Sequence, residues 1–498
     1  MKPDEVDRTE RLRQRHVADA RRALPEHLAC LDWPADRIRA VRVARLRALV
    51  QVAVERSPWH RRRLAHLDPQ RLTERDLATV PPMTKADLME HFDEIVTDPR
   101  LTRALVEEHL ATATGESYLF DRYHAVASSG SSGHRGVFVH DWDAWTTYYT
   151  ACFRFLLRQR RDTDAHREGP VRMASVAAGR PTHMSAATFR TFSDPSRFAM
   201  HRFPVTLPRE EIVAGLTAAH PEILAGYPSA LHQLALEASA GRLRISPDQV
   251  VVFGEPLLPE HREALAQAWA VPVHNWWGTS EANVIGASCG RSGGLHLHDD
   301  LYVVEPVTAT GAPVATGERS NGLLLTNLVN PLLPLLRYEI SDEVTLLDGP
   351  CPCGSTMRRV DDIQGRAEEG FRYADGTVVH PHVFRSRLGA EPAILEYRVH
   401  QHGEGAEVEV VHTGSLDLAR LGDTLTADLQ RCGVTAGRVA IVPVDHLDRG
   451  ATGKLQRFIP EPEGPATGTA PRATPSCTSR STTSRSASAA GVRPPRRR

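Results

Sequence analysis

Short apolar runs alternate with helix-like segments through the middle of this 498-residue chain, and this alternation constrains the fold more than any other feature. Residues 173–178, 250–253 and 323–328 have the length and apolar character of buried strands. Between these runs, residues 210–219 and 259–269 have helical spacing. Because such alternation favours an α/β architecture, we expect a large, multi-layer N-terminal domain of sheets flanked by helices.

The N-terminal region is expected to be helical. Residues 5–28 and 36–56 are rich in Arg, Ala and Leu at the spacing of amphipathic helices. Further on, Thr84 is predicted to cap a helix over residues 85–91, with Asp87 in its first turn.

The sequence pattern changes near residue 365, and this change predicts a second domain. Residues 391–460 indicate the order strand, strand, helix, strand. We therefore divide the chain into a large domain at 1–364, a small, mobile α+β domain at 365–460 and a tail at 461–498. The tail is rich in Pro, Ser, Thr, Ala and Arg and is expected to be disordered. Contact with an anionic partner is the alternative for its last residues, Arg496, Arg497 and Arg498.

Composition excludes several classes of protein. The net charge of -1 gives the molecule no general bias toward nucleic acid or membranes, and no apolar run approaches the length of a membrane span. The charged N-terminus has no apolar stretch behind it, so no secretion signal is expected. Seven cysteines in this length do not indicate a disulfide scaffold. These features predict a cytoplasmic protein.

A run of six small residues precedes an apolar strand at residues 137–139. It consists of Ser128, Ser129, Gly130, Ser131, Ser132 and Gly133. Glycine lets the backbone approach a ligand, and serine hydroxyls and successive N–H groups can converge on anionic oxygens. The run therefore indicates a phosphate-binding loop, with a flexible linker as the alternative when it is taken alone. It is not a Walker loop, because no Gly-Lys-Ser/Thr follows it.

Four further motifs follow this run. They are Phe253-Gly254-Glu255-Pro256, Trp276-Trp277-Gly278-Thr279-Ser280-Glu281, Arg337-Tyr338-Glu339-Ile340-Ser341-Asp342 and Gly453-Lys454-Leu455-Gln456-Arg457. In this order and spacing, the five motifs resemble those of the adenylate-forming (acyl-CoA synthetase) superfamily, and in particular its phenylacetate–CoA ligase branch. The resemblance covers roughly residues 50–460.

The resemblance implies an AMP-forming ligase that uses ATP, Mg²⁺ and CoA. A small carboxylic acid, expected to be aromatic, would be converted to an acyl-adenylate and then transferred to CoA. An amine, a carrier-protein thiol or another non-CoA nucleophile is the alternative acceptor. A catalytically inactive relative and a nucleic-acid-binding protein that acts through the tail are weaker alternatives. The protein is expected to be a monomer or a homodimer.

The resemblance also implies roles for individual residues. Lys454, Glu281 and Ser280 are the expected catalytic residues, with Glu281 holding Mg²⁺ and Ser280 contacting the α-phosphate. Residues 128–133 would bind the β- and γ-phosphates. The expected nucleotide contacts elsewhere are Gly254, Glu255, Pro256, Trp277, Gly278, Asp342 and Arg366. Among these, Trp277 replaces the family's usual tyrosine and can stack on adenine, and Asp342 would accept hydrogen bonds from the ribose hydroxyls.

A hinge is expected at Gly365-Arg366-Ala367-Glu368-Glu369, where the family has Gly-Arg-x-Asp-Asp. Glu368 stands at the hinge position, about which the small domain would swing between the two half-reactions. Glutamate has one methylene more than the family's aspartate, so the hinge geometry differs.

Four residues have the composition of a structural zinc site. Cys289, His296, Cys351 and Cys353 form a Cys₃His set, and similar spacing occurs in part of the resembling branch. His298 could replace His296, and four unligated side chains are the alternative to a metal.

Two regions depart from the branch. The phosphate loop usually ends Gly-Lys-Pro, but here Gly133 is followed by His134 and Arg135. A glycine-rich stretch is also missing near residues 173–188, where His183 can face either the substrate pocket or the surface.

Overall fold

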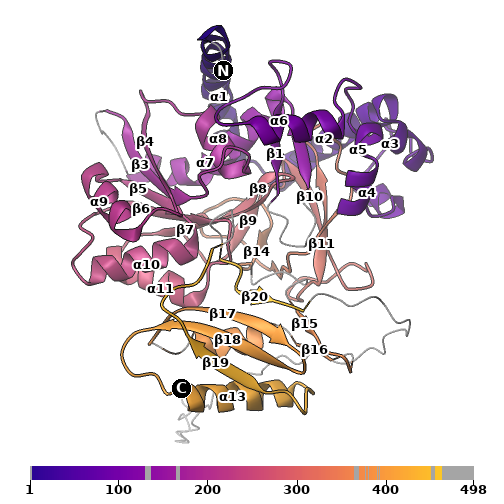
Figure 1. The fold of residues 1–498 in the computed structure, drawn as a ribbon. Helices are drawn as coiled ribbons and strands as arrows, with labels where there is room; N and C mark the ends of the chain where they lie inside the picture. The colour runs from indigo at the N-terminus through magenta and orange to yellow at the C-terminus, as the bar shows by residue number, and fades with distance from the viewer. Residues whose placement is uncertain are drawn as a thin grey trace, which may run out of the picture.

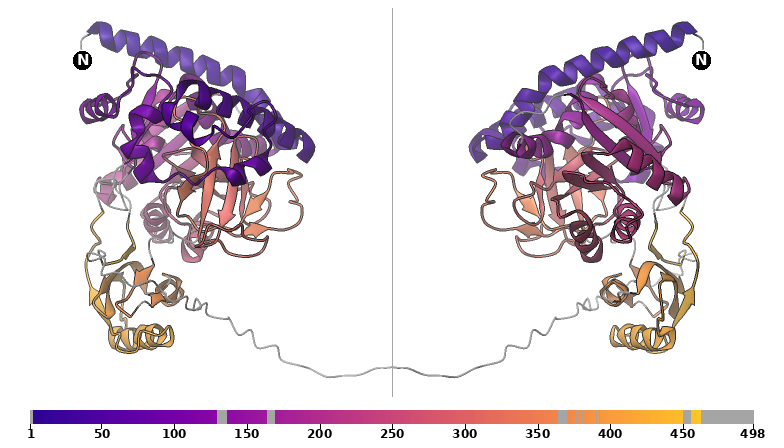
Figure 2. Two further views of the ribbon diagram at one scale, coloured as in Figure 1. Left: turned by 90° about the vertical axis from the view of Figure 1, so that its right-hand side faces the viewer. Right: turned by 90° about the vertical axis from the view of Figure 1, so that its left-hand side faces the viewer.

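The computed structural model describes residues 3–128, 136–163, 169–363, 370–375, 377–379, 381–389, 391, 393–449 and 455–461. Its N-terminal region is helical as predicted: α1 spans Pro3–Ala29 and α2 spans Ala35–Arg56. The long helix α1 runs along the outside of the molecule (Figure 2) and packs against α7, Trp142–Thr163.

Short helices connect α2 to the first strands. They are η1 (Cys30–Asp32), α3 (Pro58–Arg63), η2 (Glu74–Thr79), α4 (Lys85–Glu90), α5 (Phe92–Ile95) and α6 (Arg103–Thr112). The predicted cap of α4 is present: the Asp87 backbone N–H donates to Oγ1 of Thr84 at 3.0 Å, and the Thr84 backbone N–H donates to Asp87 at 2.8 Å.

A nine-stranded sheet forms the centre of the molecule, in the order β13-β14-β9-β8-β7-β6-β5-β3-β4 (Figure 1). Its strands are β3 (Val171–Ala177), β4 (Phe198–Pro204), β5 (Ile223–Gly226), β6 (Gln249–Phe253), β7 (Val273–Thr279), β8 (Asn283–Ala287), β9 (Leu295–Leu297), β13 (Leu346–Leu347) and β14 (Arg359–Val360). The pairs from β4 through β7 are parallel, and the pairs from β7 through β13 are antiparallel. Chemistry-bearing loops at the carboxyl ends of the parallel strands therefore lie along one edge.

Helices cover this sheet. They are α8 (Met184–Thr191), α9 (Arg209–Ala219), α10 (Pro228–Ser239) and α11 (Pro259–Trp269). The bounds of α9 and α11 agree closely with the two helices predicted in this region. The helices α9, α10 and α11 pack on β3 through β7, while α7 packs on β8. The strand β6 is buried at every position, which explains why its sequence is a continuous apolar run.

Two further sheets are antiparallel. One pairs β1 (His124–Ala127) with β2 (Val137–His140), and the other has the order β10-β11-β12. The latter strands span Tyr302–Val307, Gly322–Asn327 and Tyr338–Ile340. The predicted strand at 323–328 thus belongs to a separate sheet, because its pairing partners are its antiparallel chain neighbours.

A four-stranded sheet, β19-β18-β17-β20, occupies the C-terminal part of the chain below the large sheet in Figure 1. The elements of this part are β15 (Phe371–Arg372), β16 (Val378–Val379), α12 (His382–Leu388), β17 (Ile394–His402), β18 (Gly405–His412), α13 (Leu418–Arg431), β19 (Val439–Pro443) and β20 (Phe458–Ile459). They enclose a separate hydrophobic core that includes Tyr397, Leu425 and Phe458. The α/β class and the α+β character of this part agree with the sequence analysis. The division at residue 364 falls outside the described residues and stays a prediction.

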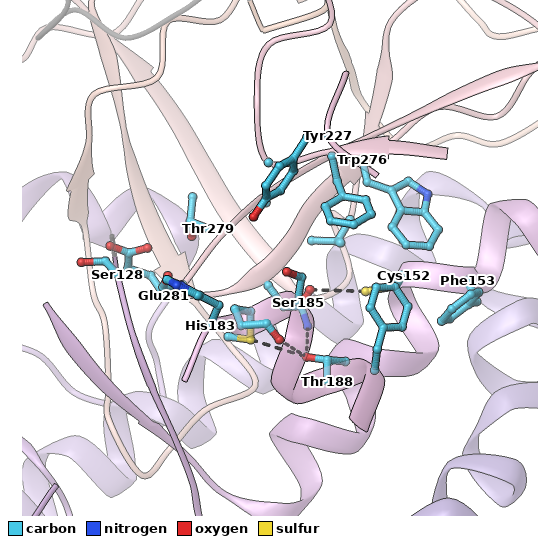
Figure 3. A pocket seen from close by; sticks show the side chains of 18 of the residues that line it. Ser128, Cys152, Phe153, His183, Ser185, Thr188, Tyr227, Trp276, Thr279 and Glu281 are labelled. Atoms are coloured by element: carbon cyan, nitrogen blue, oxygen red, sulfur yellow. Dashed lines mark hydrogen bonds between the residues drawn. The ribbon is translucent and has the colours of Figure 1, made fainter. Parts of the chain in front are cut away.

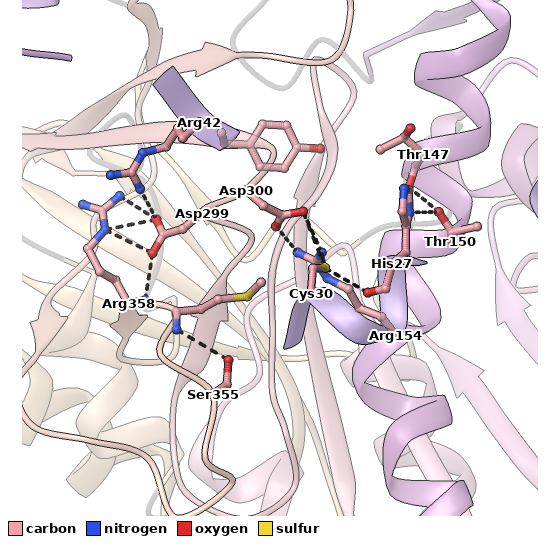
Figure 4. A network of polar contacts seen from close by, with 12 residues as sticks. His27, Cys30, Arg42, Thr147, Thr150, Arg154, Asp299, Asp300, Ser355 and Arg358 are labelled. Atoms are coloured by element: carbon pink, nitrogen blue, oxygen red, sulfur yellow. Dashed lines mark hydrogen bonds and ion pairs between the residues drawn. The ribbon is translucent and has the colours of Figure 1, made fainter. Parts of the chain in front are cut away.

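A buried ion-pair network joins α7 and the residue after α1 to the segment between β9 and β10 (Figure 4). Arg154 of α7 is fully buried and donates to both oxygens of Asp300, at 2.8 and 3.0 Å. Arg154 also donates to the Cys30 sulfur at 3.0 Å, next to the end of α1. Because both ions are buried, removing either partner would leave an uncompensated charge in the core. The network therefore has a structural role.

Candidate active site

A hairpin of β7 and β8 carries the Trp-Trp-Gly-Thr-Ser-Glu motif. Its register shifts between Trp277 and Gly278, and Ser280 and Glu281 lie in the turn. A Cβ placed on Gly278 would lie 2.3 Å from the Asn283 carbonyl oxygen, so only glycine fits there. The glycine thus permits the close turn that presents Ser280 and Glu281.

A cavity of about 160 Å³ lies beside this turn (Figure 3). Its lining brings together predicted site residues from three separate motifs: Ser128, Gly254, Gly278, Ser280 and Glu281. The nearest of these residues from different motifs, Gly254 and Gly278, are 24 positions apart in sequence, so their meeting is a property of the fold.

The described end of the serine run closes a β-hairpin. Ser128 follows β1, and its backbone N–H donates to the Gly136 carbonyl at 2.9 Å. Its hydroxyl in turn accepts a hydrogen bond from the Gly136 N–H at 2.8 Å. Ser128, at the base of this hairpin, lines the cavity.

A hydrogen bond joins the side chains of two residues that are predicted to bind the nucleotide. Nε1 of Trp277 donates to Oδ2 of Asp342 at 2.7 Å, and both side chains are buried. The Tyr338 hydroxyl donates to Oε1 of Glu281 at 3.4 Å. These two hydrogen bonds connect the motif at residues 337–342 to the β7–β8 hairpin.

The Gly-Glu-Pro turn follows β6 directly. Gly254 has φ +80°, a conformation that favours glycine. The Glu255 carboxylate accepts from the Ser229 N–H at 3.2 Å, at the start of α10, and from the Leu455 N–H at 2.9 Å. Pro256 is half-buried beside them. Glu255 thus joins the large sheet to the C-terminal part of the chain.

Several predicted site residues lie outside the described residues. They are Ser129, Gly130, Ser131, Ser132, Gly133, Arg366 and Lys454, together with the expected hinge residue Glu368. Leu455 directly follows Lys454 in the chain, so its hydrogen bond to Glu255 fixes the position of the residue next to the predicted catalytic lysine.

The sequence analysis did not assign Lys85 a role, although this residue lines the same cavity. A Cβ built on Gly136 would lie 2.9 Å from Cε of Lys85, so the lysine stem lies against the end of the serine loop. A signal was present in the sequence: the chain has only three lysines, Lys2, Lys85 and Lys454, among 60 basic residues. A chain that otherwise uses arginine is expected to keep lysine where a compact ammonium is needed.

Aromatic side chains line the remainder of the cavity: Phe153, Phe189, Tyr227, Phe253 and Trp276. His183 also lines it, which answers the question left open by the sequence. Cys152, Thr188 and Asn283 are polar lining residues that sequence reasoning missed, because nothing in their local sequence marks them.

The predicted cysteine–histidine set is assembled away from the cavity lining. Ligand atoms of Cys289, His296, Cys351 and Cys353 all lie within 4.8 Å of one another. The sulfur atoms of Cys289 and Cys351 are 3.6 Å apart, and Nε2 of His296 is 3.4 Å from the Cys353 sulfur. Two thiolates on one tetrahedral zinc lie about 3.8 Å apart, since each Zn–S bond is about 2.3 Å. The group therefore fits a closed zinc site.

The imidazole in this group is already oriented. Nδ1 of His296 lies 3.3 Å from the Met357 carbonyl oxygen, which leaves Nε2 facing the cysteines. His298, the alternative ligand, is fully buried and does not belong to the group.

Comparisons with known proteins agree with this geometry. The phenylacetate–coenzyme A ligase of Thermus thermophilus is 27% identical to the chain over 412 residues, which cover 78% of this chain and 81% of that protein. The ligase of the same name from Escherichia coli is 30% identical over 214 residues, 41% of this chain and 45% of that protein. No protein-family model matches the chain.

Solved structures show the same fold. A 2-hydroxyisobutyryl-CoA ligase in its postadenylation state has a TM-score of 0.68 at 18% identity, with 86% of this chain and 91% of that chain covered. The same ligase in its thioesterification state has a TM-score of 0.56 at 20% identity, over 86% of this chain and 91% of that chain.

The fold is therefore that of the 2-hydroxyisobutyryl-CoA ligase structures. Over most of its length the chain is homologous to the phenylacetate–coenzyme A ligases. The resemblance stated from the motifs is confirmed.

Proposed function

We propose that this protein is an AMP-forming ligase that activates a small carboxylic acid with ATP and transfers the acyl group to coenzyme A. The observation that carries the proposal is the cavity that gathers Ser128, Gly254, Gly278, Ser280 and Glu281 from distant motifs. Homology to phenylacetate–CoA ligases over most of the chain supports it. A cytoplasmic location and a monomeric or homodimeric state stay predictions.

The phosphates of ATP would lie between the serine loop and the β7–β8 turn. The acid and the triphosphate are both anions, so their meeting requires positive charge and directed donors. Lys85 supplies an ammonium at the end of the loop, where the branch's usual loop lysine is replaced by His134. Lys85 makes no ion pair with another residue in the described part of the chain. Its charge is therefore available to an anionic ligand.

Glu281 would hold Mg²⁺, which prefers carboxylate, phosphate and water oxygens. Its carboxylate lines the cavity, and Tyr338 donates to only one of its oxygens. Ser280, next to it, would contact the α-phosphate. Trp277 and Asp342 would contact adenine and ribose, and their mutual hydrogen bond orients both.

Lys454 would neutralise charge that develops on the acid carboxylate and the α-phosphate during adenylation. The hydrogen bond from Leu455 to Glu255 supports this role, because it ties the adjacent residue to the rim of the nucleotide site. The higher similarity to the postadenylation state of 2-hydroxyisobutyryl-CoA ligase than to its thioesterification state supports the same arrangement.

A structural zinc ion would bind Cys289, His296, Cys351 and Cys353. Four protein ligands leave no open coordination position, so the zinc would stabilise the fold and take no part in the reaction.

ATP–pyrophosphate exchange tests the function across a panel of acids, with and without CoA. Exchange with an acid, together with CoA-dependent AMP release, is the expected result. Exchange without any effect of CoA would favour the alternative acceptors, an amine or a carrier-protein thiol. Absence of exchange with every acid would refute the adenylation chemistry.

Replacing Lys454 tests the role of this residue in adenylation, the first half-reaction. Lys454→Ala should lower exchange by at least about 100-fold, because a charge that acts in the transition state is lost. The melting temperature should change little. Unchanged exchange in this variant would refute the assigned role.

A further inference from the structure

The end of the cavity away from Ser128 and Glu281 combines an aromatic wall with one buried amide (Figure 3). The five rings of Phe153, Phe189, Tyr227, Phe253 and Trp276 pack edge and face against one another, with neighbouring centroids 5.3 to 6.3 Å apart. The amide belongs to Asn283, which is 7% exposed. Such walls suit a planar ring.

Two hydrogen bonds fix the orientation of this amide. The Cys152 thiol donates to Oδ1 of Asn283 at 3.3 Å, and Nδ2 of Asn283 lies 3.2 Å from Oγ1 of Thr188. The Thr188 hydroxyl donates its only hydrogen to the Met184 carbonyl at 2.8 Å, so it must accept from the amide. Burial raises the pKa of the Cys152 thiol, which keeps it protonated and able to donate.

The amide keeps unused hydrogen-bonding capacity. A carboxamide has two N–H donors and an oxygen with two lone pairs, and these contacts use one of each. In the part of the chain that the structure describes, neither the second N–H nor the second lone pair of Asn283 has a protein partner. A buried donor and acceptor in an apolar site are costly until a ligand pairs with them.

We infer that the pocket selects a single-ring aromatic acid that carries a hydroxyl group on its ring. Asn283 is the residue that forms hydrogen bonds with this hydroxyl. The hydroxyl accepts from the free N–H of Nδ2 and donates to Oδ1, so one substituent satisfies both groups. The inference rests on the proposed acid-activating function and specifies its substrate.

A substrate panel on the full chain tests the inference. Benzoate and phenylacetate are compared with their 2-, 3- and 4-hydroxy isomers and with the matching methyl ethers. The readouts are kcat/KM for ATP–pyrophosphate exchange and the Kd of each acid by titration calorimetry. The best hydroxy isomer should exceed both its parent and its methyl ether by about 10- to 100-fold, because the ether accepts but cannot donate. A parent acid that equals or exceeds every hydroxy isomer would overturn the inference.

Two variants connect the preference to the amide. Asn283→Gly removes the side chain and tolerates the backbone φ of +56°, and it should abolish the preference for the hydroxy isomer. Cys152→Ala also removes one hydrogen bond from the network but leaves the amide held by Thr188, so it should retain the preference. A preference that survives in Asn283→Gly would overturn the inference. If that variant does not fold, the wild-type panel decides.

The panel also separates this inference from the proposed function. Exchange with several acids but no benefit from a hydroxyl group would leave the ligase function and remove the specificity. Absence of exchange with every acid would remove the ligase function. The Kd series would then decide, since tighter binding of a hydroxy isomer supports the pocket assignment and equal affinities contradict it.

Discussion

At the scale of single residues, the site depends on side chains that differ from the usual family pattern. Trp277 stands where a tyrosine is usual, and its indole can only donate a hydrogen bond. It donates to Oδ2 of Asp342, so this hydrogen bond orients the carboxylate. The side chains of Trp277 and Asp342 are thus coupled by one hydrogen bond.

Trp277→Phe should raise the KM for ATP by about tenfold, because the stacking ring remains while the hydrogen bond to the Asp342 carboxylate is lost. Steady-state kinetics of the exchange reaction measure the effect. Trp269→Phe is the matched control, since its indole nitrogen has no hydrogen-bond partner within the described residues. An equal KM in the Trp277 variant and the wild type would show that the bond does not orient Asp342.

Lys85→Met should raise the KM for ATP and lower exchange by about 10- to 100-fold, because it removes a charge near the phosphates while it keeps a stem of similar length. Lys85→Arg restores the charge and should recover part of the activity. A methionine variant with wild-type kinetics would show that Lys85 does not contact the triphosphate.

At the scale of elements, the cysteine–histidine group lies at one side of the central sheet. His296 lies on β9, Cys289 precedes that strand, and Cys351 and Cys353 lie between β13 and β14. These short strands have few ladder hydrogen bonds of their own, so a shared metal would hold them together.

Elemental analysis should therefore find about one zinc per chain in the purified protein. Cys351→Ser should lose the metal and lower the melting temperature, as should treatment of the wild type with a strong chelator. Cys432→Ser, which changes a cysteine of the C-terminal part, should retain zinc. A metal-free wild type with unaltered stability would remove the zinc proposal.

The elements that could be predicted from the sequence are those whose signals are local. The apolar run of β6, the helical spacing of α9 and the capping box of α4 each depend on neighbouring residues alone. Partners that come from distant segments could not be predicted in this way. The placement of β11 in a second sheet, the choice of His296 over His298 and the approach of Lys85 to the serine loop all require the folded chain.

The distinction between local signals and partners from distant segments also applies to the pocket. Motif residues that line it, such as Ser128 and Glu281, could be predicted because the spacing of their motifs resembles a known family. Asn283, Cys152 and Thr188 come from three different elements, and each has ordinary local sequence. Their meeting is a tertiary property that no motif encodes.

At the scale of the whole molecule, Arg449 connects the C-terminal part to the region of the Gly-Glu-Pro turn. Arg449 donates to the Ser229 hydroxyl at 2.9 Å and to Glu396 on β17 at 2.5 Å. Its guanidinium also lies 4.0 Å from the Glu255 carboxylate. One side chain thereby joins both parts of the molecule at the residue that precedes the segment carrying Lys454.

Arg449→Gln should lower ATP–pyrophosphate exchange by about 10- to 100-fold, because charge-assisted hydrogen bonds that hold the lysine segment at the site are lost. The second half-reaction, measured as CoA-dependent consumption of a supplied acyl-adenylate, should not decline, since Lys454 is expected to leave the site for that step. Arg387→Gln is the matched control: it removes an ion pair to Asp428 within the C-terminal part, at 2.7 Å, and should leave both half-reactions intact. An equal loss in both half-reactions of the Arg449 variant would instead indicate a general structural role. A selective loss of adenylation would show that this arginine stabilises the arrangement in which the acid meets ATP.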